Sequence, residues 1–495
     1  MVSMMGDDVN ALVSMLNDAL KQQIMPNLYS IQKNSQGEQK KRLLGFIGFN
    51  QQPPNQWPQL YSDQRRREEL LRAVFQEDVS VSRTCPLCSS PIGRAPPNLT
   101  LSVYPLVTKN KAFSGARTRW AGSGFEGRPT NVSVCPRCYL LGALTWADDA
   151  LLYLCGMGRD RNNKLAVVIL PAPPEPDLIT LHRQKEEYRE RLRHERGPRS
   201  NVYFRPPHAE YTGKQAEEGE QEGKKTPVRE GRFSLLLAFL EQTLHEVAQK
   251  SYGQPFQMDV IRRQIPNGWL FISIPQGRMK NVNVHDLLLD DPTLQLLARL
   301  VEADVQPYAQ IMAQLALQDD EGKPLPDEQL EMREAMAQGL LTNSFATFAR
   351  AFLPRPRQRL RLYGSSENHI FTLVKEWRWK GMEEQIETIR KAAYALARIA
   401  ASRRQPVILY QLERVRTRKD LLSVLQQATH RLIGMDAQDM RYIPINDIED
   451  LVQLVCKDTV PFEDLKNTIF VFAGVEYARK VRAKEKSSQG GESDA

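Results

Sequence analysis

The chain has 495 residues, of which 67 are lysine or arginine and 59 are aspartate or glutamate, so its formal net charge at pH 7 is +8. Hydrophobic residues make up 41% and charged residues 25%, which is typical of folded proteins and excludes collagen-like and fully disordered chains. No apolar stretch approaches the roughly 20 residues of a membrane span, and the N-terminus lacks the basic and apolar segments of a secretion signal. We therefore expect a cytoplasmic protein without membrane contact, with two to four domains at about 100–200 residues each.

Residues 1–181 are predicted to form an α/β domain. Apolar residues recur at helical spacing after Asp7 and Asp8, and again after Asp63, and aspartate is a favoured helix N-cap. Short apolar or alternating runs indicate strands. We predict helices at 7–25, 63–74 and 139–154 and strands at 43–49, 99–107 and 165–170.

The composition changes at about residue 182. From there to residue 231 the chain is rich in Arg, Lys, Glu, Gly and Gln, and 215–225 has no large apolar residue. Such a segment buries too little apolar surface to offset its conformational entropy. We predict that 182–231 is a charged flexible linker or insertion, either simply solvated or ordering on a nucleic acid.

The rest of the chain is predicted to be mostly helical, with residues 232–381 as a middle region and 382–495 as an all-helical bundle. The overall prediction is an α+β fold. The middle region has one predicted strand, at 269–274, and helices at 233–250, 283–302, 304–317, 326–341 and 343–353. In the bundle we predict helices at 383–404, 418–433, 446–457 and 461–482.

The strongest chemical signal is a pair of C-P-x-C motifs, Cys85 with Cys88 and Cys135 with Cys138. Each motif turns two thiolates toward one point, and together they provide the four-sulfur tetrahedral shell that structural Zn²⁺ prefers. A redox dithiol or an iron–sulfur cluster is the alternative. A closed four-cysteine shell offers no open coordination position, so we expect no catalysis there. Apolar neighbours predict that Cys155 and Cys456 are buried core thiols.

Three clusters of cations are candidates for nucleic-acid contact. The first lies between the cysteine motifs, beside Phe113, Trp120 and a glycine-containing stretch at 122–128; this stretch neither follows a strand nor opens a helix, which argues against a dinucleotide site. The second belongs to 350–380, which holds eight basic and two acidic residues and also Phe371, Trp377 and Trp379. Its four alternating arginines would share one face of an extended strand. The third surrounds a predicted loop between C-terminal helices. The alternative for each is a solvated surface. The candidate residues are Lys109, Lys111, Arg117 and Arg119; Arg355, Arg357, Arg359 and Arg361; and Arg403, Arg404, Arg416 and Arg418.

Familiar catalytic signatures are absent from the sequence: it contains no G-x-x-x-x-G-K-S/T, H-E-x-x-H or G-x-S-x-G motif. His285-Asp286 precedes a predicted helix, where Asp286 is expected to be an N-cap. The pairs at 148–149, 290–291 and 319–320 are expected to cap helices or lie in solvated loops. We therefore expect a binding protein without catalytic residues rather than an enzyme.

The two cysteine pairs, split by a glycine-containing insertion and followed by Tyr-Leu-Leu-Gly-Ala-Leu at 139–144, resemble the large subunit of type I CRISPR effector complexes (Cascade). The similarity is to the zinc-containing forms of subtypes I-A and I-B and covers about residues 80–155. The resemblance implies a non-catalytic subunit that recognises the protospacer-adjacent motif, helps to unwind target DNA and recruits an effector. The implied partners are a guide RNA, target double-stranded DNA, the backbone, handle-binding and small subunits of the complex, and a helicase-nuclease or transposition proteins.

The helical C-terminus resembles the small subunits of such complexes, which some related systems also produce from an internal start codon. Met382 opens the predicted bundle. We therefore consider a separate product covering residues 382–495, against the alternative that Met382 is an ordinary residue near a helix start. Two other classes of function stay open: a metal-dependent nucleic-acid enzyme that uses the acidic pairs, and a zinc-binding assembly scaffold without DNA contact.

Overall fold

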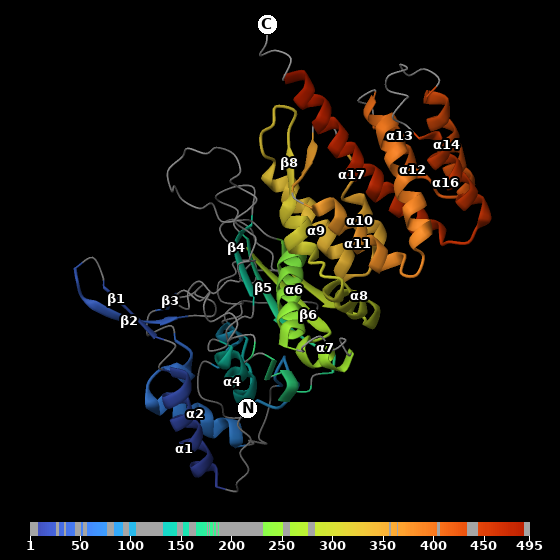
Figure 1. The fold of residues 1–495 in the computed structure, drawn as a ribbon. Coiled ribbons are helices and arrows are strands. Elements are labelled where there is room, and N and C mark those ends of the chain that lie inside the picture. The colour runs from blue at the N-terminus through green and yellow to red at the C-terminus, as the bar shows by residue number, and fades with distance from the viewer. Residues whose placement is uncertain are drawn as a thin grey trace. The chain divides into compact units, whose positions relative to one another are not determined.

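In the computed structural model the chain divides into two units, Met1–Phe204 with Trp269–Asp286, and Arg205–Gly268 with Leu287–Ala495 (Figure 1). The predicted boundaries near residues 181, 231 and 381 remain predictions. No helix among the described residues is long and apolar enough to cross a membrane. The structure describes residues 8–25, 29–33, 36–44, 51–52, 57–76, 84–92, 99–104, 132–145, 152–157, 165–175, 177, 179–181, 183–184, 187, 231–250, 258–275, 283–355, 358–363, 365–402, 406–432 and 444–489.

Two packed helices begin the first unit and confirm the predictions for this region. Helix α1 (Val9–Ala19) is capped by the Asp8 carboxylate and continues as the π-helical turn η1 (Leu20–Ile24). Helix α2 (Gln64–Phe75) begins after Asp63, whose carboxylate accepts the Arg66 N–H at 2.9 Å. The two helices are joined by the buried Arg67, which donates from Nε to Asn17 Oδ1 at 2.6 Å.

The first unit contains two sheets. One has the order β1 (Tyr29–Lys33), β2 (Gln39–Leu44), β3 (Gln51–Gln52). The other has the order β4 (Leu152–Met157), β5 (Leu165–Pro171), β6 (Gly268–Pro275), β7 (Asn283–Leu288). In these sheets β1 with β2, β2 with β3, β4 with β5 and β5 with β6 pair antiparallel. Strands β5 and β6 confirm the predicted strands, and their register places Ile169 opposite Phe271, with both side chains buried. This pairing joins segments on opposite sides of the predicted charged linker.

Several predicted elements of the N-terminal half are wrong in type or extent. The segment predicted as a strand at 99–107 contains the 3₁₀ turn η6 (Leu101–Val103), with an isolated bridge from Thr100 to Ser133. The helix predicted at 139–154 is the shorter α4 (Pro136–Leu144), and its apolar continuation pairs as β4. A short continuous apolar run fits a buried strand and a buried helix equally well, so tertiary pairing decides between them.

The second unit is mainly helical, as predicted. Its first part contains α6 (Arg232–Lys250), α7 (Met258–Gln264), α8 (Asp291–Glu302), α9 (Pro326–Leu341), α10 (Phe345–Arg350) and α11 (Ser366–Arg378). The helix predicted at 283–302 is shorter because its beginning forms β7. The helix predicted at 304–317 is instead a π turn, η10 (Pro307–Ile311), a 3₁₀ turn, η11 (Met312–Gln314), and strand β8 (Leu315–Gln318), which pairs with β9 (Arg359–Leu362).

Helix α6 begins against a carboxylate from another helix. Glu334 of α9 accepts the N–H groups of Arg232 at 2.8 Å, Phe233 at 3.0 Å and Ser234 at 3.1 Å. A Cβ atom on Gly231 would lie 2.0 Å from Glu334 Oε2, so glycine leaves the space that this cap occupies. Burial raises the pKa of Glu334. The sequence did not predict this cap, because the partners are about a hundred residues apart.

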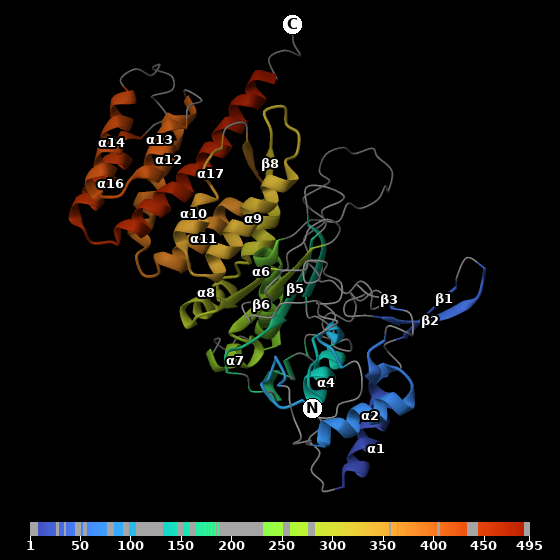
Figure 2. The ribbon, with the colours of Figure 1, turned by 180° about the vertical axis from the view of Figure 1, so that it is seen from behind.

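The C-terminal helices form a bundle in which the helix at Glu383–Ser402 packs against the other described helices (Figures 1 and 2), in agreement with the predicted all-helical C-terminus. The four predicted helices are confirmed, and the described residues also include α13, which was not predicted. Helix α17 continues to Gln489, beyond its predicted end. The helices are α12 (Glu383–Ser402), α13 (Val407–Arg414), α14 (Arg418–Leu432), α16 (Ile445–Lys457) and α17 (Phe462–Gln489).

Helix α17 is also covered by residues that precede Met382. Trp379 is fully buried and donates from Nε1 to Thr468 Oγ1 at 2.8 Å. A Cβ atom on Gly474 would lie 2.6 Å from the carbonyl oxygen of Phe352, so α17 lies directly against the end of α10. The ring of Phe371 stacks on Phe472, with centroids 5.8 Å apart.

A fragment that begins at Met382 is therefore expected to be unstable on its own. It would uncover the face of α17 that Phe352, Phe371 and Trp379 contact, and losing a buried aromatic side chain costs about 3–5 kcal/mol. Thermal unfolding followed by circular dichroism checks this expectation, with a fragment that begins at Pro326 as the control, because it keeps α9, α10 and α11. A cooperative transition at the same temperature in both fragments would contradict it.

Candidate metal centre and basic surfaces

The first cysteine motif is a tight hydrogen-bonded turn. The Cys85 N–H donates to the Ser90 carbonyl at 2.7 Å, and the Ser89 N–H donates to the Cys85 carbonyl at 2.8 Å. Ser89 adopts the left-handed conformation (φ 60°) that closes the turn. An isolated bridge between Thr84 and Pro91 holds its two ends together. The backbone thus brings Cys85 and Cys88 to the same side of the loop.

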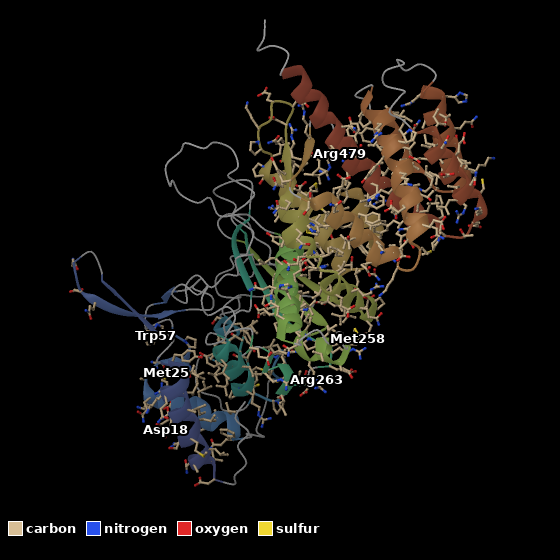
Figure 3. All side chains as sticks on the ribbon, viewed as in Figure 1. Asp18, Met25, Trp57, Met258, Arg263 and Arg479 are labelled. Carbon is tan, nitrogen blue, oxygen red and sulfur yellow. The ribbon has the colours of Figure 1, made fainter. Side chains whose placement is uncertain are left out.

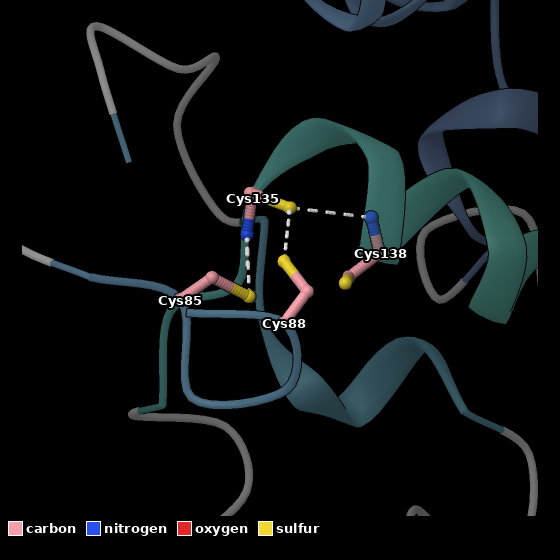
Figure 4. Close-up of side chains that lie close together, drawn as sticks. All are labelled: Cys85, Cys88, Cys135 and Cys138. Carbon is pink, nitrogen blue, oxygen red and sulfur yellow. Dashed lines mark hydrogen bonds between the residues drawn. The ribbon is translucent and has the colours of Figure 1, made fainter. Parts of the chain in front are cut away.

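The second motif opens a helix. Cys135 is the N-cap of α4 and Pro136 occupies the first turn, where the missing proline N–H costs nothing. The Cys138 N–H donates to Cys135 Sγ at 3.4 Å, and the Cys135 N–H donates to Cys85 Sγ at 3.4 Å (Figure 4). These bonds connect the two motifs and direct N–H groups at sulfur atoms.

All four predicted cysteines come together. Their sulfur atoms lie within 4.8 Å of one another, and Cys88 Sγ is 3.5 Å from Cys135 Sγ. Zinc–sulfur bonds of about 2.3 Å in a tetrahedron separate sulfurs by about 3.8 Å, so the cluster has the dimensions of such a shell. Cys85, Cys135 and Cys138 are 1%, 3% and 7% exposed. The four cysteines can hold a metal ion such as zinc; among the described residues no other group of this kind occurs.

Electrostatics in the cluster favour a cation. Burial raises the pKa of Cys135 and Cys138, and the neighbouring thiols raise the pKa of Cys138 further. Burial also acts against ionisation of Cys88, but hydrogen bonds from Ser90, Cys138 and Cys135 together outweigh it and lower the pKa of this thiol to about 6. Burial and the four thiols raise the pKa of Tyr104 to about 12. One thiolate forms readily, whereas four adjacent thiolates require a positive charge among them.

Tyrosines position the helix that carries the second motif. Tyr104 donates from its hydroxyl to the Cys138 carbonyl at 2.8 Å, and Tyr61 donates to the Ala143 carbonyl at 2.7 Å. The Tyr139 hydroxyl accepts the Gln59 N–H at 3.1 Å. A Cβ atom on Gly142 would lie 2.6 Å from Val103 Cγ1, so α4 packs directly on η6. These supporting residues were not predicted from the sequence, although Gly142 lies within the 139–144 segment next to the second cysteine motif.

The first predicted cation cluster, Lys109, Lys111, Arg117 and Arg119, lies outside the described residues. Its contact with nucleic acid stays a prediction.

The structure describes three of the four arginines of the second cluster, Arg355, Arg359 and Arg361. Strands β8 and β9 form a two-stranded ribbon in which Leu317 pairs with Leu360, while Gln318 pairs with Arg359 and Ala316 with Arg361. Leu315 and Leu317 are buried, so the alternation puts Arg359 and Arg361 together on the opposite face. The predicted shared face is therefore present for these two arginines. Arg357 lies outside the described residues.

The arginines of this cluster have acidic or polar neighbours. Arg359 Nε lies 3.2 Å from Asp320 Oδ1, and Arg361 Nε donates to Gln318 Oε1 at 3.0 Å. Arg355 lies 4.0 Å from Glu331. Exposed ion pairs of this kind are worth at most about 1 kcal/mol, so a phosphate can compete for these guanidinium groups.

In the third cluster, Arg418 has contacts that stabilise the fold. Arg418 donates to the Val455 carbonyl at 3.2 Å and also contacts the Val460 carbonyl and the Asp458 carboxylate, and so it closes the end of α16. Its guanidinium lies 6.0 Å from the ring of Phe462, at the start of α17. Arg416 is exposed beside it. Arg403 and Arg404 lie outside the described residues.

The tryptophans near the second cluster are core residues. Trp377 is 6% exposed and donates to Asn343 Oδ1 at 2.8 Å, and Trp379 is fully buried. Neither ring presents a face on which a base could stack. Their cationic neighbours also have partners: Lys375 lies 3.3 Å from Glu383, and Arg378 lies 3.6 Å from Asp464.

Two smaller predictions are wrong. Asp286 lies within β7 and does not cap a helix; Asp290 caps α8 by accepting the Thr293 N–H at 2.8 Å. Cys456 is exposed near the end of α16 rather than buried, because the apolar stripe of this helix passes through Leu451 and Val455. Cys155 lies in β4. The structure does not describe its side chain, so its burial stays a prediction.

Acidic pairs in the described regions have structural roles. Asp291 lies 2.6 Å from Arg262, and Asp319 accepts the N–H groups of Glu321 at 2.9 Å and Lys323 at 2.8 Å. Asp320 pairs with Arg359, as described above. The pair at 148–149 lies outside the described residues. Capping and ion pairing account for the described pairs.

Comparison with known proteins gives no relative. No known protein family, no curated protein and no solved structure matches this chain. Functional inference therefore starts from the residues of the chain itself.

Proposed function

We propose that this chain is the non-catalytic large subunit of an RNA-guided surveillance complex, with a structural zinc ion in its first unit. Its role would be to recognise the protospacer-adjacent motif, to help open the duplex and to recruit an effector. The observation that carries the proposal is the four-cysteine cluster, which joins two C-P-x-C motifs across a long cationic insertion. This is the arrangement that resembles the zinc-containing large subunits.

Zinc is the ion that best fits the donor set. Thiolates are soft ligands that select Zn²⁺, Cu⁺ or iron–sulfur clusters over Mg²⁺ and Ca²⁺. Buried cysteines in a closed tetrahedral shell are typical of structural zinc. Bound there, the ion would supply no reaction chemistry; it would hold the loop of Cys85 against the start of α4 and so tie together the two ends of the segment between Cys88 and Cys135.

Nucleic-acid binding is supported by the polar face of the β8–β9 ribbon. Arg359 and Arg361 lie there on one side of the ribbon, and a phosphate can compete with the exposed Asp320 carboxylate for Arg359. Base pairing with a guide provides sequence specificity in RNA-guided complexes, so the protein needs mainly backbone contacts. Phosphate contacts position a nucleic acid without reading its sequence.

Co-purification tests the proposal. A tagged full-length chain, isolated from its host, is expected to bring down one population of short RNAs that share a common repeat-derived end, together with other protein subunits. Sequencing the bound RNA provides the readout, and a tagged unrelated basic protein is the control for non-specific RNA. Heterogeneous RNA, or none, would contradict the guided-complex function. Cleavage of labelled duplex with Mg²⁺ or Mn²⁺ by the purified chain would favour a nuclease instead.

A further inference from the structure

Helix α17 leaves the bundle core partway along its length. Its residues from Leu465 to Glu476 are buried on nearly every side, whereas Arg479 is half-exposed. The helix continues to Gln489, so residues 477–489 extend it by about 20 Å at 1.5 Å per residue. Figure 3 labels Arg479 on this part of the helix.

This extension is strongly basic. Residues 479–486 include five basic residues and one acidic residue, Glu485, a net charge of +4 in little more than two turns. At 100° per residue, Arg479, Arg482 and Lys486 share one face of the helix, and Lys480 and Lys484 lie on a neighbouring face. The basic positions therefore occupy a wide sector of the helix circumference rather than a single line along it.

The arginine ribbon lies beside this extension. Strand β9 contacts α17, and Figures 1 and 2 show the β8–β9 ribbon alongside the C-terminal half of that helix. By contrast, Arg418 lies at the other end of α17, beside Phe462. Arg418 is therefore remote from Arg359 and Arg361 along α17, and the part of α17 that lies beside the ribbon is its C-terminal half.

We propose that the ribbon and the end of α17 form one binding surface for the phosphate backbone of a nucleic acid. We call it the ribbon–helix surface; it consists of Arg359, Arg361, Arg479, Lys480, Arg482, Lys484 and Lys486. This inference rests on the proposed nucleic-acid function and assigns it a place in the second unit.

Charge and composition favour a nucleic acid over other anionic partners. A membrane-binding helix needs a broad apolar face with Trp, Phe or Leu, but Val481 is the only large apolar residue in 478–489. Protein interfaces are anchored by aromatic or large apolar side chains, which this stretch also lacks. Closely spaced lysines and arginines on a rigid helix match the regular phosphates of a nucleic acid strand.

Ion pairs anchor α17 to the rest of the second unit just before its last turns. Arg479 Nε lies 2.7 Å from Glu476 Oε2 and its NH1 lies 3.4 Å from Glu367 Oε2, so this residue fixes the helix to α11. Lys480 lies 4.0 Å from Glu476. The next cations, Arg482, Lys484 and Lys486, follow one or two turns beyond the buried Glu476. These three are the residues to change, because they lie past the core.

The test compares two variants of the full-length chain with equal loss of charge. The first carries Arg482→Gln, Lys484→Gln and Lys486→Gln; the matched control carries Arg263→Gln, Lys391→Gln and Lys457→Gln, three exposed cations on α7, α12 and α16. Binding of fluorescent duplex DNA, single-stranded DNA and single-stranded RNA is measured by anisotropy between about 50 and 200 mM salt.

The first variant is expected to bind about tenfold more weakly and to lower the slope of log affinity against log salt by about 2–3 units, with the control unchanged. The probe with the largest slope change identifies the strand type. If the wild-type chain binds and the first variant keeps its slope, the surface lies elsewhere, although the proposed function stands. If both variants lose affinity equally, the effect follows from net charge rather than from this surface, and the inference is overturned. If the wild-type chain binds none of the probes, both proposals fail.

Discussion

Replacing Cys135 with serine, or removing metal with a strong chelator, is expected to unfold much of the first unit. Three of the four cysteines belong to the core of that unit and pack with Leu99, Leu101 and Val134. Without the ion, the buried thiols must be neutral and the loop of Cys85 is no longer tied to α4. Zinc binding contributes about 10–16 kcal/mol to folding in small zinc domains, more than the total stability of most domains.

Differential scanning calorimetry with metal analysis is the measurement. The wild-type chain is expected to contain one zinc per chain and to lose one thermal transition on chelation, while the transition of the second unit persists. Cys456→Ser is the matched control, since this thiol is exposed on α16 in the second unit. Iron in place of zinc would assign a cluster instead. A Cys135→Ser chain that retains both metal and transition would refute the role of the site.

The metal ligands could be predicted because their chemistry is local. Each C-P-x-C motif fixes its own pair of sulfurs within four residues, so only the meeting of the two pairs needed the structure. The helices of the C-terminal bundle were also predictable, because long amphipathic patterns leave little choice of secondary structure. The pairing of β5 with β6 was not, since nothing near either strand specifies a partner about a hundred residues away.

The burial of the tryptophans could have been predicted, because the sequence contains a helical apolar pattern that was given less weight than the composition. Arginines and tryptophans that alternate in sequence suggest a stacking surface, but Ile370, Leu373, Val374 and Trp377 recur at helical spacing. That pattern makes Trp377 part of the apolar face of α11. The alternation of Arg359 and Arg361 had no competing helical pattern, and there the chain forms strand β9, which puts these two arginines on one face. The presence of aromatic residues near cations therefore does not predict a base-stacking surface where the same aromatic residues recur at helical spacing with other apolar residues.

The stability of the second unit is expected to fall as pH rises from 5 to 8, and Glu241 is the cause. This α6 carboxyl is buried and accepts the N–H groups of Tyr308 and Ala309, at the start of η10. Burial raises its pKa from 4.5 to about 8, although the two N–H groups act to lower it. On the same helix, four residues further along, the ring nitrogens of His245 contact Gln306 at 3.4 Å and Gln249 at 3.0 Å.

The sign follows from proton linkage. A carboxyl whose pKa is higher in the folded than in the unfolded chain keeps its full contribution below pH 4.5 and loses it as pH approaches 8. The loss for Glu241 alone amounts to about 3 kcal/mol between pH 5 and 8. Glu241→Gln keeps an acceptor for the Tyr308 N–H and has no proton to release. The variant is therefore expected to flatten this part of the pH profile and to be more stable than the wild type at pH 8.

Urea unfolding of the second unit at several pH values gives the difference in free energy between wild type and variant, in which unrelated groups cancel. Glu246→Gln is the matched control: it removes the same charge from the same helix at a half-buried site, where the carboxylate accepts from Gln242 at 3.2 Å. The difference for Glu241→Gln should grow with pH and that for Glu246→Gln should not. Parallel profiles for the two variants would show that Glu241 is ionised in the folded chain. In that case the two backbone N–H groups at the start of η10 would stabilise a buried, negatively charged Glu241 carboxylate.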